Sequence, residues 1–195
     1  MRYKSGHREE SKAKILSAVG RGFRKHGYEG IGIDGLAKEA GLTSGAFYGH
    51  FSSKEEAFNE TVIEGFRDLR ENIEQLQSER GENWVALFVD FYLGTRRTCD
   101  LAESCALQTL THEVARSSEL VRESYQVEVM KVIDVVAKGL PQGTMAERRN
   151  RAWALMSLLS GGVTVARALA DDALSAKTAK ALRSAALVIA NDNQG

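Results

Sequence analysis

Residues 33–51 read IDGLAKEAGLTSGAFYGHF, and this stretch decides how the amino-terminal part of the chain folds. Its apolar residues form two short groups on either side of a glycine: Leu36, Ala37 and Ala40, then Leu42, Phe47 and Phe51. That glycine, Gly41, has no Cβ and can adopt the left-handed backbone conformation of a tight turn. Small Ala37 and Ala40 allow a second helix to approach the first closely. The pattern therefore predicts two short helices joined by a tight turn.

Two arrangements fit such a pair of helices. One is the helix-turn-helix of DNA-binding proteins, in which the second helix enters the major groove. The other is an ordinary pair of antiparallel helices inside a helical bundle, with no role in recognition. The pair by itself leaves both interpretations open.

Helical periodicity continues on both sides of this pair. A first helix is expected from about Glu9 to His26, with Gly27 as its carboxyl-terminal stop. Ser53 lies three residues before Glu56, a capping-box spacing that predicts the start of a long helix. The clearest apolar stripe of the chain follows, with residues three or four positions apart: Phe58, Val62, Phe66, Leu69, Ile73 and Leu76.

The remainder of the chain also reads as helices. We expect them near residues 84–92, 101–115, 119–140, 144–170 and 174–190, the fourth of these opening on a Thr144–Glu147 capping box. The helix over 119–140 is apolar nearly all round, which favours a central position. Because alternating β-branched runs are missing from the sequence, the predicted fold class is all-α.

The composition excludes several classes of protein. The chain has 195 residues, 43% of them hydrophobic and 27% charged, which is typical of a soluble globular protein of one or two domains. No run of about 18 apolar residues is long enough to span a membrane, and the amino terminus lacks a secretory signal pattern. Two cysteines cannot form a disulfide scaffold, so a reducing cytoplasm is the expected location.

The net charge of zero hides an asymmetry between the two ends of the chain. Residues 1–54 contain ten basic and five acidic residues, a formal charge of +5. The other 141 residues contain 16 basic and 21 acidic residues, a formal charge of −5. A basic end on an acidic body indicates that only one end meets a polyanion, although a solvated surface of this charge is also common.

The amino-terminal part resembles the TetR/AcrR family of bacterial transcriptional regulators. The resemblance rests on about 50 residues, and the matching segments are Gly27-Tyr28, Leu36 to Gly41, Gly45 to Phe51, and Ser53 to Glu55 continuing to Phe58. It implies a three-helix DNA-binding head, residues 1–52, on a body of about six helices, residues 53–195, that binds a ligand and forms a dimer. The implied function is a ligand-responsive regulator, most simply a repressor, that binds palindromic operator DNA as a homodimer and is released by a small-molecule inducer. It implies no enzyme activity and no cofactor.

The resemblance assigns roles within the head. The expected phosphate contacts, which position the protein without reading sequence, are Tyr48, His50 and Lys54. The expected base contacts lie at the start of the second short helix: Thr43, Ser44, Gly45 and Ala46. Thr43 has an alternative role as the amino-terminal cap of that helix, and Tyr48 has one as a core residue.

The chain departs from the family pattern before the first short helix. The family usually places Thr or Ser there as a cap and phosphate contact, whereas this chain has Gly30-Ile31-Gly32. A weaker cap is therefore expected. Gly35 lies inside the same helix, at a cost of about 0.5–1 kcal/mol relative to alanine.

The body offers candidate ligand contacts, cysteines and a dimer interface. Its large aromatic and methionine side chains either line a cavity for a hydrophobic or aromatic effector or form the core: Trp84, Phe88, Phe91, Tyr92, Tyr125, Met130, Trp153 and Met156. Cys99 and Cys105 are six residues apart and are either inert thiols or redox sensors. They do not form a metal-binding pattern, and neither does His112-Glu113 with Arg116, where a zinc-protease helix would need a second His.

A homodimer is expected through the last two helices, whose small side chains permit close helix packing. The faces expected to meet carry Trp153, Met156, Ser160, Val163 and Ala166 on one helix and Ala179, Leu182, Ala186 and Ile189 on the other. The alternative is that both faces pack within one subunit.

Overall fold

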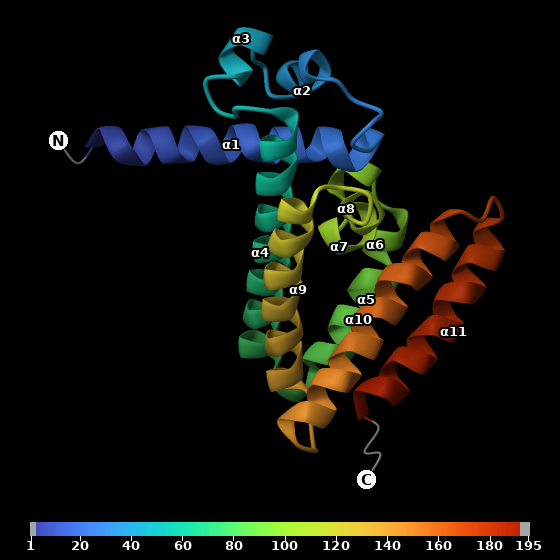
Figure 1. Ribbon diagram of the computed structural model, residues 1–195. Coiled ribbons are helices and arrows are strands. Elements are labelled where there is room, and N and C mark those ends of the chain that lie inside the picture. Colours follow the sequence, from blue (N-terminus) through green and yellow to red (C-terminus); the bar gives the residue numbers. More distant parts are fainter. Residues whose placement is uncertain (1–2, 192–195) are drawn as a thin grey trace. The chain divides into compact units, whose positions relative to one another are not determined.

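The computed structural model describes residues 3–191, with side chains from Glu10 onward, and every regular element in that range is helical (Figure 1). The charges of Arg2, Lys4, Arg8 and Glu9 counted above thus lie outside the described side chains. The elements are α1 (Tyr3–His26), α2 (Ile33–Glu39), α3 (Ser44–Phe47), α4 (Lys54–Arg80), η1 (Gly81–Asn83), α5 (Trp84–Leu93), α6 (Thr95–Thr98), η2 (Leu101–Glu103), α7 (Ala106–Thr109), α8 (Thr111–Val114), α9 (Glu119–Gly139), α10 (Met145–Arg167) and α11 (Asp172–Asn191). The predicted all-α class is confirmed.

The described residues form two compact units. The first unit contains residues 3–65 and 100–125, and the second contains residues 66–99 and 126–191. The first unit thus includes the whole predicted head and also a segment far along the chain. The expected functional boundary between residues 52 and 53 stays a prediction, because a compact unit is defined by contacts and not by activity.

The core of the first unit lies between α1 and the beginning of α4. The apolar residues expected to form the face of α1 are all buried: Ile15, Leu16, Val19 and Phe23. Phe23 meets Phe58 of α4 edge to face, with ring centroids 5.2 Å apart, and both rings pack against Tyr28. Gly27 ends α1 with a φ of +76°, as its place in the sequence predicted.

The prediction of a single helix over residues 101–115 is wrong. The segment instead forms the short pieces η2, α7 and α8, all in the first unit. Asp100 caps η2 by accepting a hydrogen bond from the Ala102 backbone N–H at 2.8 Å, and the backbone of Ser104 and Cys105 is extended. Asp100 thus starts η2, and the extended backbone at Ser104 and Cys105 separates η2 from α7.

The core of the second unit is built around α5. The rings of Trp84, Phe88 and Tyr92 form a row, with centroids 6.2 and 5.5 Å apart, and all three are buried. Trp84 donates a hydrogen bond from Nε1 to the carbonyl of Gly139 at 2.9 Å. A Cβ on Gly139 would lie 3.0 Å from Trp84 Cε2 and would displace the amide of Gln77, so glycine allows these two side chains to pack closely on the last turn of α9.

Two expectations about the long helices need correction. Helix α9 is not buried all round, since Leu120, Val127 and Met130 are exposed. The faces of α10 and α11 expected to meet a second subunit pack largely within the chain: Met156, Val163, Ala166, Ala179 and Ala186 are buried. Leu182 lies so close to Gly162 that a Cβ there would be 2.6 Å from Leu182 Cδ1. The reason is that one strongly apolar face of each helix is needed for the core of a single subunit.

Arg167, at the end of α10, holds the short helix α6 in the second unit. Its guanidinium donates hydrogen bonds to the carbonyls of Arg96, Arg97 and Cys99, at 2.8, 3.1 and 2.7 Å. These carbonyls belong to the carboxyl-terminal end of α6, where backbone acceptors have no partner within the helix. A planar group with five N–H donors can satisfy several of them at once.

We expect Arg167→Ala to lower the free energy of unfolding by about 2–4 kcal/mol, because several partly buried carbonyls lose a charged donor. Urea denaturation followed by circular dichroism measures the change. The control is Arg183→Ala, whose ion pair with Asp90 at 2.5 Å is half exposed and screened by water, so its loss should cost much less stability. Equal losses from the two variants would contradict the role given to Arg167.

Candidate nucleic-acid interface

The paired short helices form as the sequence predicts. Gly41 has a φ of +66°, and the Leu42 backbone N–H donates to the Ala37 carbonyl at 2.8 Å, which closes the turn after α2. Leu36, Ala37 and Phe47 are buried between the two helices and the rest of the unit. Gly32 precedes α2 without any side-chain hydrogen bond, so the expected weak cap is confirmed.

Gly35 has a packing reason for its place inside α2. A Cβ at this position would lie 2.8 Å from Ile31 Cγ1, closer than real Cβ contacts. The glycine therefore lets the buried side chain of Ile31 lie against the helix. This packing contact offsets the lower helix propensity of glycine.

The amino-terminal end of α3 carries the four residues expected to contact bases. Thr43 is the cap of α3, because its Oγ1 accepts a hydrogen bond from the Ala46 backbone N–H at 3.2 Å. This confirms the alternative role considered for it, and its hydroxyl hydrogen stays available. Ser44 is half-buried, whereas Thr43, Gly45 and Ala46 are exposed. The structure thus brings the four residues together on one short helix end.

Gly45 has open space around it within the protein. The nearest atom to a Cβ placed there would be Thr43 Oγ1, at 4.0 Å. Neither the packing of the chain nor a positive φ requires glycine at this position, unlike Gly41. The absence of a side chain therefore leaves the exposed surface of α3 flat enough for another molecule to approach.

Tyr48 ends α3 with its ring partly packed and its surface half exposed. The ring meets Phe47 edge to face, with centroids 6.0 Å apart, while 54% of the residue is accessible. This arrangement fits an aromatic ring that packs on the head and presents its hydroxyl outward. His50 lies nearby in the chain, half-buried, with its ring next to that of Phe51 at 6.4 Å.

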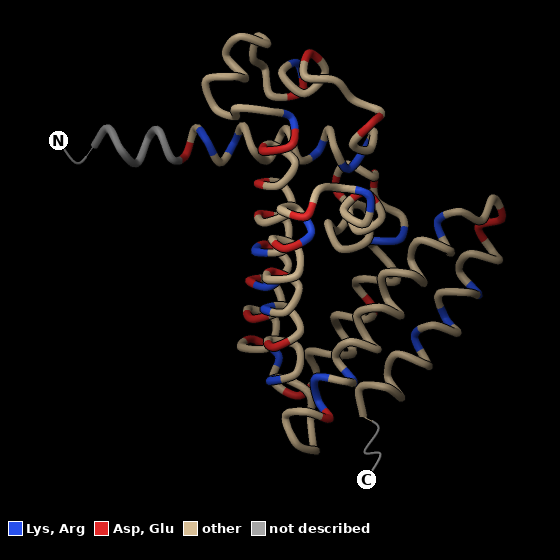
Figure 2. Tube along the Cα trace, viewed as in Figure 1, with Lys and Arg blue, Asp and Glu red and all other residues tan. Residues whose placement is uncertain are grey.

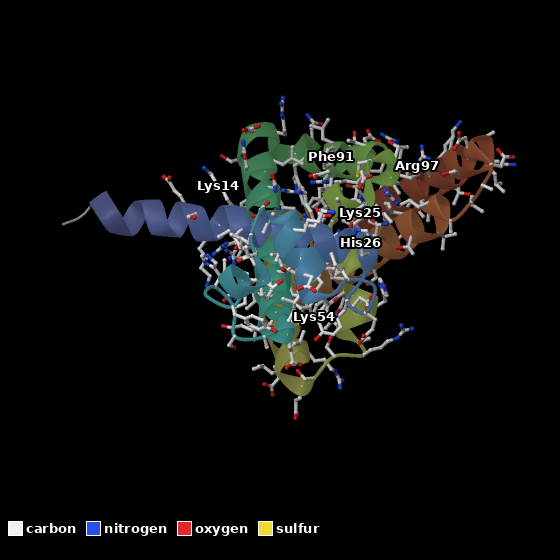
Figure 3. The ribbon with its side chains drawn as sticks, turned by 90° about the horizontal axis from the view of Figure 1, so that it is seen from above. Lys14, Lys25, His26, Lys54, Phe91 and Arg97 are labelled. Atoms are coloured by element: carbon white, nitrogen blue, oxygen red, sulfur yellow. The ribbon has the colours of Figure 1, made fainter. Side chains whose placement is uncertain are left out.

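Lys54 begins α4 and lies over an aromatic ring. Its Nζ is 4.3 Å from the centroid of Tyr28, and Figure 3 shows its place in the head, with Lys14, Lys25 and His26 along α1. A cation above a ring keeps its N–H donors, so Lys54 can still bind a phosphate. Burial, followed by the charges of Glu55 and Glu29, raises the pKa of Tyr28, which keeps the phenol neutral under the ammonium.

The start of α4 is capped much as predicted. Ser53 Oγ accepts from the Glu56 backbone N–H at 3.0 Å. The Glu56 carboxylate reaches back one residue further than expected, to the backbone N–H and the hydroxyl of Ser52. These two donors hold the pKa of Glu56 below its usual value. The cap fixes the direction of Lys54 and the first turn of α4.

In the first unit, basic residues predominate on the described part of α1, whereas the beginning of α4 is mostly acidic after Lys54 (Figure 2). Lys12 of α1 pairs with Glu60 of α4 at 2.9 Å, so this lysine is partly neutralised. One carboxylate lies beside α3: Asp34 of α2 accepts a hydrogen bond from Ser44 Oγ at 2.5 Å. Sequence reasoning missed this pair, because ten residues separate the two and no periodic pattern relates them.

Sequence reasoning also missed the contact of α1 with the segment after residue 100. Arg24 donates from Nε to the carbonyl of Ala102 in η2 at 2.7 Å, across 78 residues of sequence. Gly27 lies against Glu113 of α8, whose Oε1 would be 2.7 Å from a Cβ at that glycine. Because the partners in each contact lie far apart in the sequence, no local signal could have predicted either contact.

The residues expected to contact a ligand are not all gathered in one place. Trp84, Phe88 and Tyr92 form the buried row of the second unit, whereas Phe91 and Trp153 are exposed there. Phe91 has the guanidinium of Arg96 5.1 Å from its ring centroid. Tyr125 belongs to the first unit, where its hydroxyl lies 3.2 Å from Thr111 Oγ1. Their role toward a ligand stays a prediction.

The two cysteines are free thiols in different units. Cys99 is half-buried, with its Sγ 3.9 Å from an Arg167 nitrogen, and Cys105 is buried. Both roles considered for these thiols, inert and redox-active, stay predictions. Among the described residues no group of three or more His, Cys, Asp or Glu is placed to hold a metal ion, and no helix is both long and apolar enough to cross a membrane.

Known proteins similar to this chain are bacterial regulators. Residues 15–61 match the model of the bacterial regulatory proteins of the tetR family. The HTH-type transcriptional regulator LmrA of Bacillus subtilis (strain 168) is 26% identical over 163 residues, covering 79% of this chain and 85% of that protein. Reduced NemR of E. coli has a TM-score of 0.76 at 19% identity, over 91% of this chain and 95% of its own. FadR of Bacillus subtilis, solved with stearoyl-CoA, has a TM-score of 0.63 at 18% identity, over 88% and 97%.

A turn fixed by Gly41, a capped and exposed α3, and a lysine at the start of α4 define a DNA-binding protein of the helix-turn-helix class. The match of residues 15–61 to the tetR family model, together with the HTH-type regulators that the chain resembles, supports a transcriptional regulator of the TetR family. Members of this family regulate transcription and are not enzymes.

Phosphate and base contacts in the head should separate on substitution. Tyr48→Phe, His50→Ala and Lys54→Ala are expected to weaken binding to operator and random DNA by similar factors, and Lys54→Ala should reduce the salt slope by about one. Ala46→Ser should instead change which sequences bind, by about 1–3 kcal/mol per altered base contact. Fluorescence anisotropy at several salt concentrations measures both effects.

Lys177→Ala on α11 removes an equal charge outside the head and should leave DNA binding unchanged. The assignment of roles would be wrong if Lys54→Ala altered the preferred sequence while Ala46→Ser did not.

Proposed function

We propose that this protein is a ligand-responsive transcriptional repressor that binds a palindromic operator as a homodimer. The observation that carries the proposal is the exposed end of α3, where Thr43, Gly45 and Ala46 form a low surface next to Tyr48. This is the geometry needed for a short helix to enter the major groove. The similarity to named HTH-type regulators supports the regulatory role.

The proposed effector is a small molecule with a large hydrophobic or aromatic part. FadR of Bacillus subtilis, which shares the fold, was solved with stearoyl-CoA. In this chain the second unit concentrates large apolar side chains on α5, and Trp84, Phe88 and Tyr92 are the candidates to contact the effector. A hydrophobic ligand would exchange water for such side chains on binding.

The proposed mechanism is a shift between two states of the dimer. Successive half-sites on one face of DNA place the two recognition helices about 34–36 Å apart, or a multiple of this distance. A ligand that prefers a state with another separation lowers the operator affinity by its difference in binding free energy between the states. Because the operator lies on the bacterial chromosome, the proposed location is the cytoplasm.

The test begins with selection of bound DNA from a random pool by the full-length chain. A palindromic consensus is expected, and compounds are then screened for those that release this DNA in an anisotropy assay. Transcription in vitro from a promoter carrying the consensus should fall when the protein is added and recover with the active compound. Retention of DNA without sequence preference would contradict the regulator, and an operator affinity that no compound changes would contradict the ligand response.

A further inference from the structure

One acidic side chain lies beside the recognition helix and controls the hydrogen bonding of another residue. Asp34, exposed on α2, accepts the hydrogen of Ser44 Oγ, with the oxygens 2.5 Å apart. Ser44 is the first residue of α3, between the exposed Thr43 and Gly45. The carboxylate is therefore held at the amino-terminal end of α3, among the residues that are proposed to contact the bases.

This hydrogen bond fixes the polarity of the Ser44 hydroxyl. A serine has one hydrogen to donate and two lone pairs that accept, and an ionised carboxylate only accepts. Because Ser44 gives its hydrogen to Asp34, both side chains can only accept a hydrogen bond from any third group. Thr43 is the opposite case, because its oxygen accepts from the Ala46 backbone N–H and its hydrogen can still be donated.

A pair that only accepts can recognise only donors on the edge of a base. In the major groove these are the N4 amino group of cytosine and the N6 amino group of adenine. Guanine presents only the acceptors O6 and N7, and thymine presents the acceptor O4, so neither base could place a hydrogen between itself and Asp34 or Ser44. The phosphates of every sequence would also be repelled by the charge of Asp34.

We propose that Asp34 is a specificity-determining residue, which makes Ser44 an acceptor and with it selects cytosine or adenine at the base that the pair contacts. The inference rests on the proposed binding of an operator through α3. It differs from a purely structural role, in which the bond between Asp34 and Ser44 only holds α3 against α2.

Asp34→Asn separates these two roles. The amide oxygen can still accept the hydrogen of Ser44, so the link between α2 and α3 is kept, while the NH₂ group adds two donors. Ser44→Ala removes the hydroxyl and leaves the carboxylate as the only acceptor. Glu29→Gln is the matched control, since it removes one exposed carboxylate of the head that is not bonded to α3.

The experiment is selection from a random DNA pool with the full-length wild type and the three variants, followed by sequencing and by anisotropy on single-base variants of the selected site. The wild type should favour cytosine or adenine over guanine or thymine by about tenfold at one position of each half-site. Asp34→Asn should accept guanine or thymine there and bind all DNA several-fold more tightly. Ser44→Ala should keep the preference but weaken it, and Glu29→Gln should leave it unchanged.

The outcomes distinguish the inference from the function on which it rests. A wild-type site that Asp34→Asn selects unchanged, with affinities that differ only by a common factor, overturns the role of Asp34 and leaves the regulator intact. Loss of binding by Asp34→Asn, with its helical circular dichroism preserved, also overturns it. A wild type that selects no sequence contradicts the proposed function and this inference together.

Discussion

Gly45→Leu is expected to abolish specific operator binding, by more than about 100-fold, while the protein stays folded. The reason lies in the surroundings of this glycine, where a Cβ would meet no atom of the chain closer than 4.0 Å. A leucine therefore fits the free protein and projects from the exposed surface of α3, where it would collide with the base edges that Thr43 and Ala46 are proposed to contact. Replacing glycine in a helix also adds about 0.5–1 kcal/mol of helix propensity.

Binding and stability should thus change in opposite directions. Anisotropy with the selected operator measures the affinity, and a thermal melt followed by circular dichroism should show an unchanged or higher Tm. Gly45→Ala is the graded control and should weaken operator binding less than the leucine. An operator affinity within threefold of the wild type for Gly45→Leu would show that α3 does not approach the bases closely.

The double substitution Val165→Glu with Val188→Glu is expected to convert the proposed homodimer into a monomer. With the buried faces of α10 and α11 committed to the core, the faces left exposed are the candidates for the dimer. They carry small and apolar residues at helical spacing: Trp153, Ser157, Gly161 and Val165 on α10, Ala168 directly after its end, and Leu174, Ala181, Ala185 and Val188 on α11. Two carboxylates at the centre of such an interface would lose water without gaining a partner.

The loss of the dimer should be visible in two measurements. Sedimentation equilibrium at micromolar concentration should change from dimer to monomer, and operator affinity should fall by about 100-fold or more, since the second half-site no longer assists the first. Val127→Glu is the control, because this valine of α9 has a similar exposure of 54% against 58% for Val165. A monomeric wild type, or a monomer produced by Val127→Glu alone, would contradict the interface.

The helices with strong local signals could be predicted from the sequence. The stripe on α4, the stop at Gly27 and the capping box at Thr144 each depend on residues within one or two turns of each other, and each is found in the structure. The stretch over residues 101–115 was mispredicted because its apolar residues have helical spacing, while the extended backbone at Ser104 and Cys105 has no such local signature.

In the candidate site, too, features that depend on nearby residues could be predicted, whereas contacts between different elements could not. The turn at Gly41 and the positions of Thr43 to Ala46 follow from local spacing, so the sequence by itself determined where the recognition helix lies. The link from Asp34 to Ser44 and the stacking of Lys54 on Tyr28 join different elements, and they form only when tertiary packing brings those elements together.

The sequence by itself determined that this protein is all-helical, that its amino-terminal end carries a helix-turn-helix, and that the chain resembles TetR-family regulators. Periodicity and capping are short-range properties, because a helix forms its hydrogen bonds four residues apart. Only the tertiary structure decided which face of α10 and α11 is buried, that Arg24 reaches Ala102, and that Asp34 directs the hydroxyl of Ser44. Each of these depends on which residues distant in the chain compete for the same space or the same hydrogen-bond donor, and the spacing of residues along one helix does not contain that information.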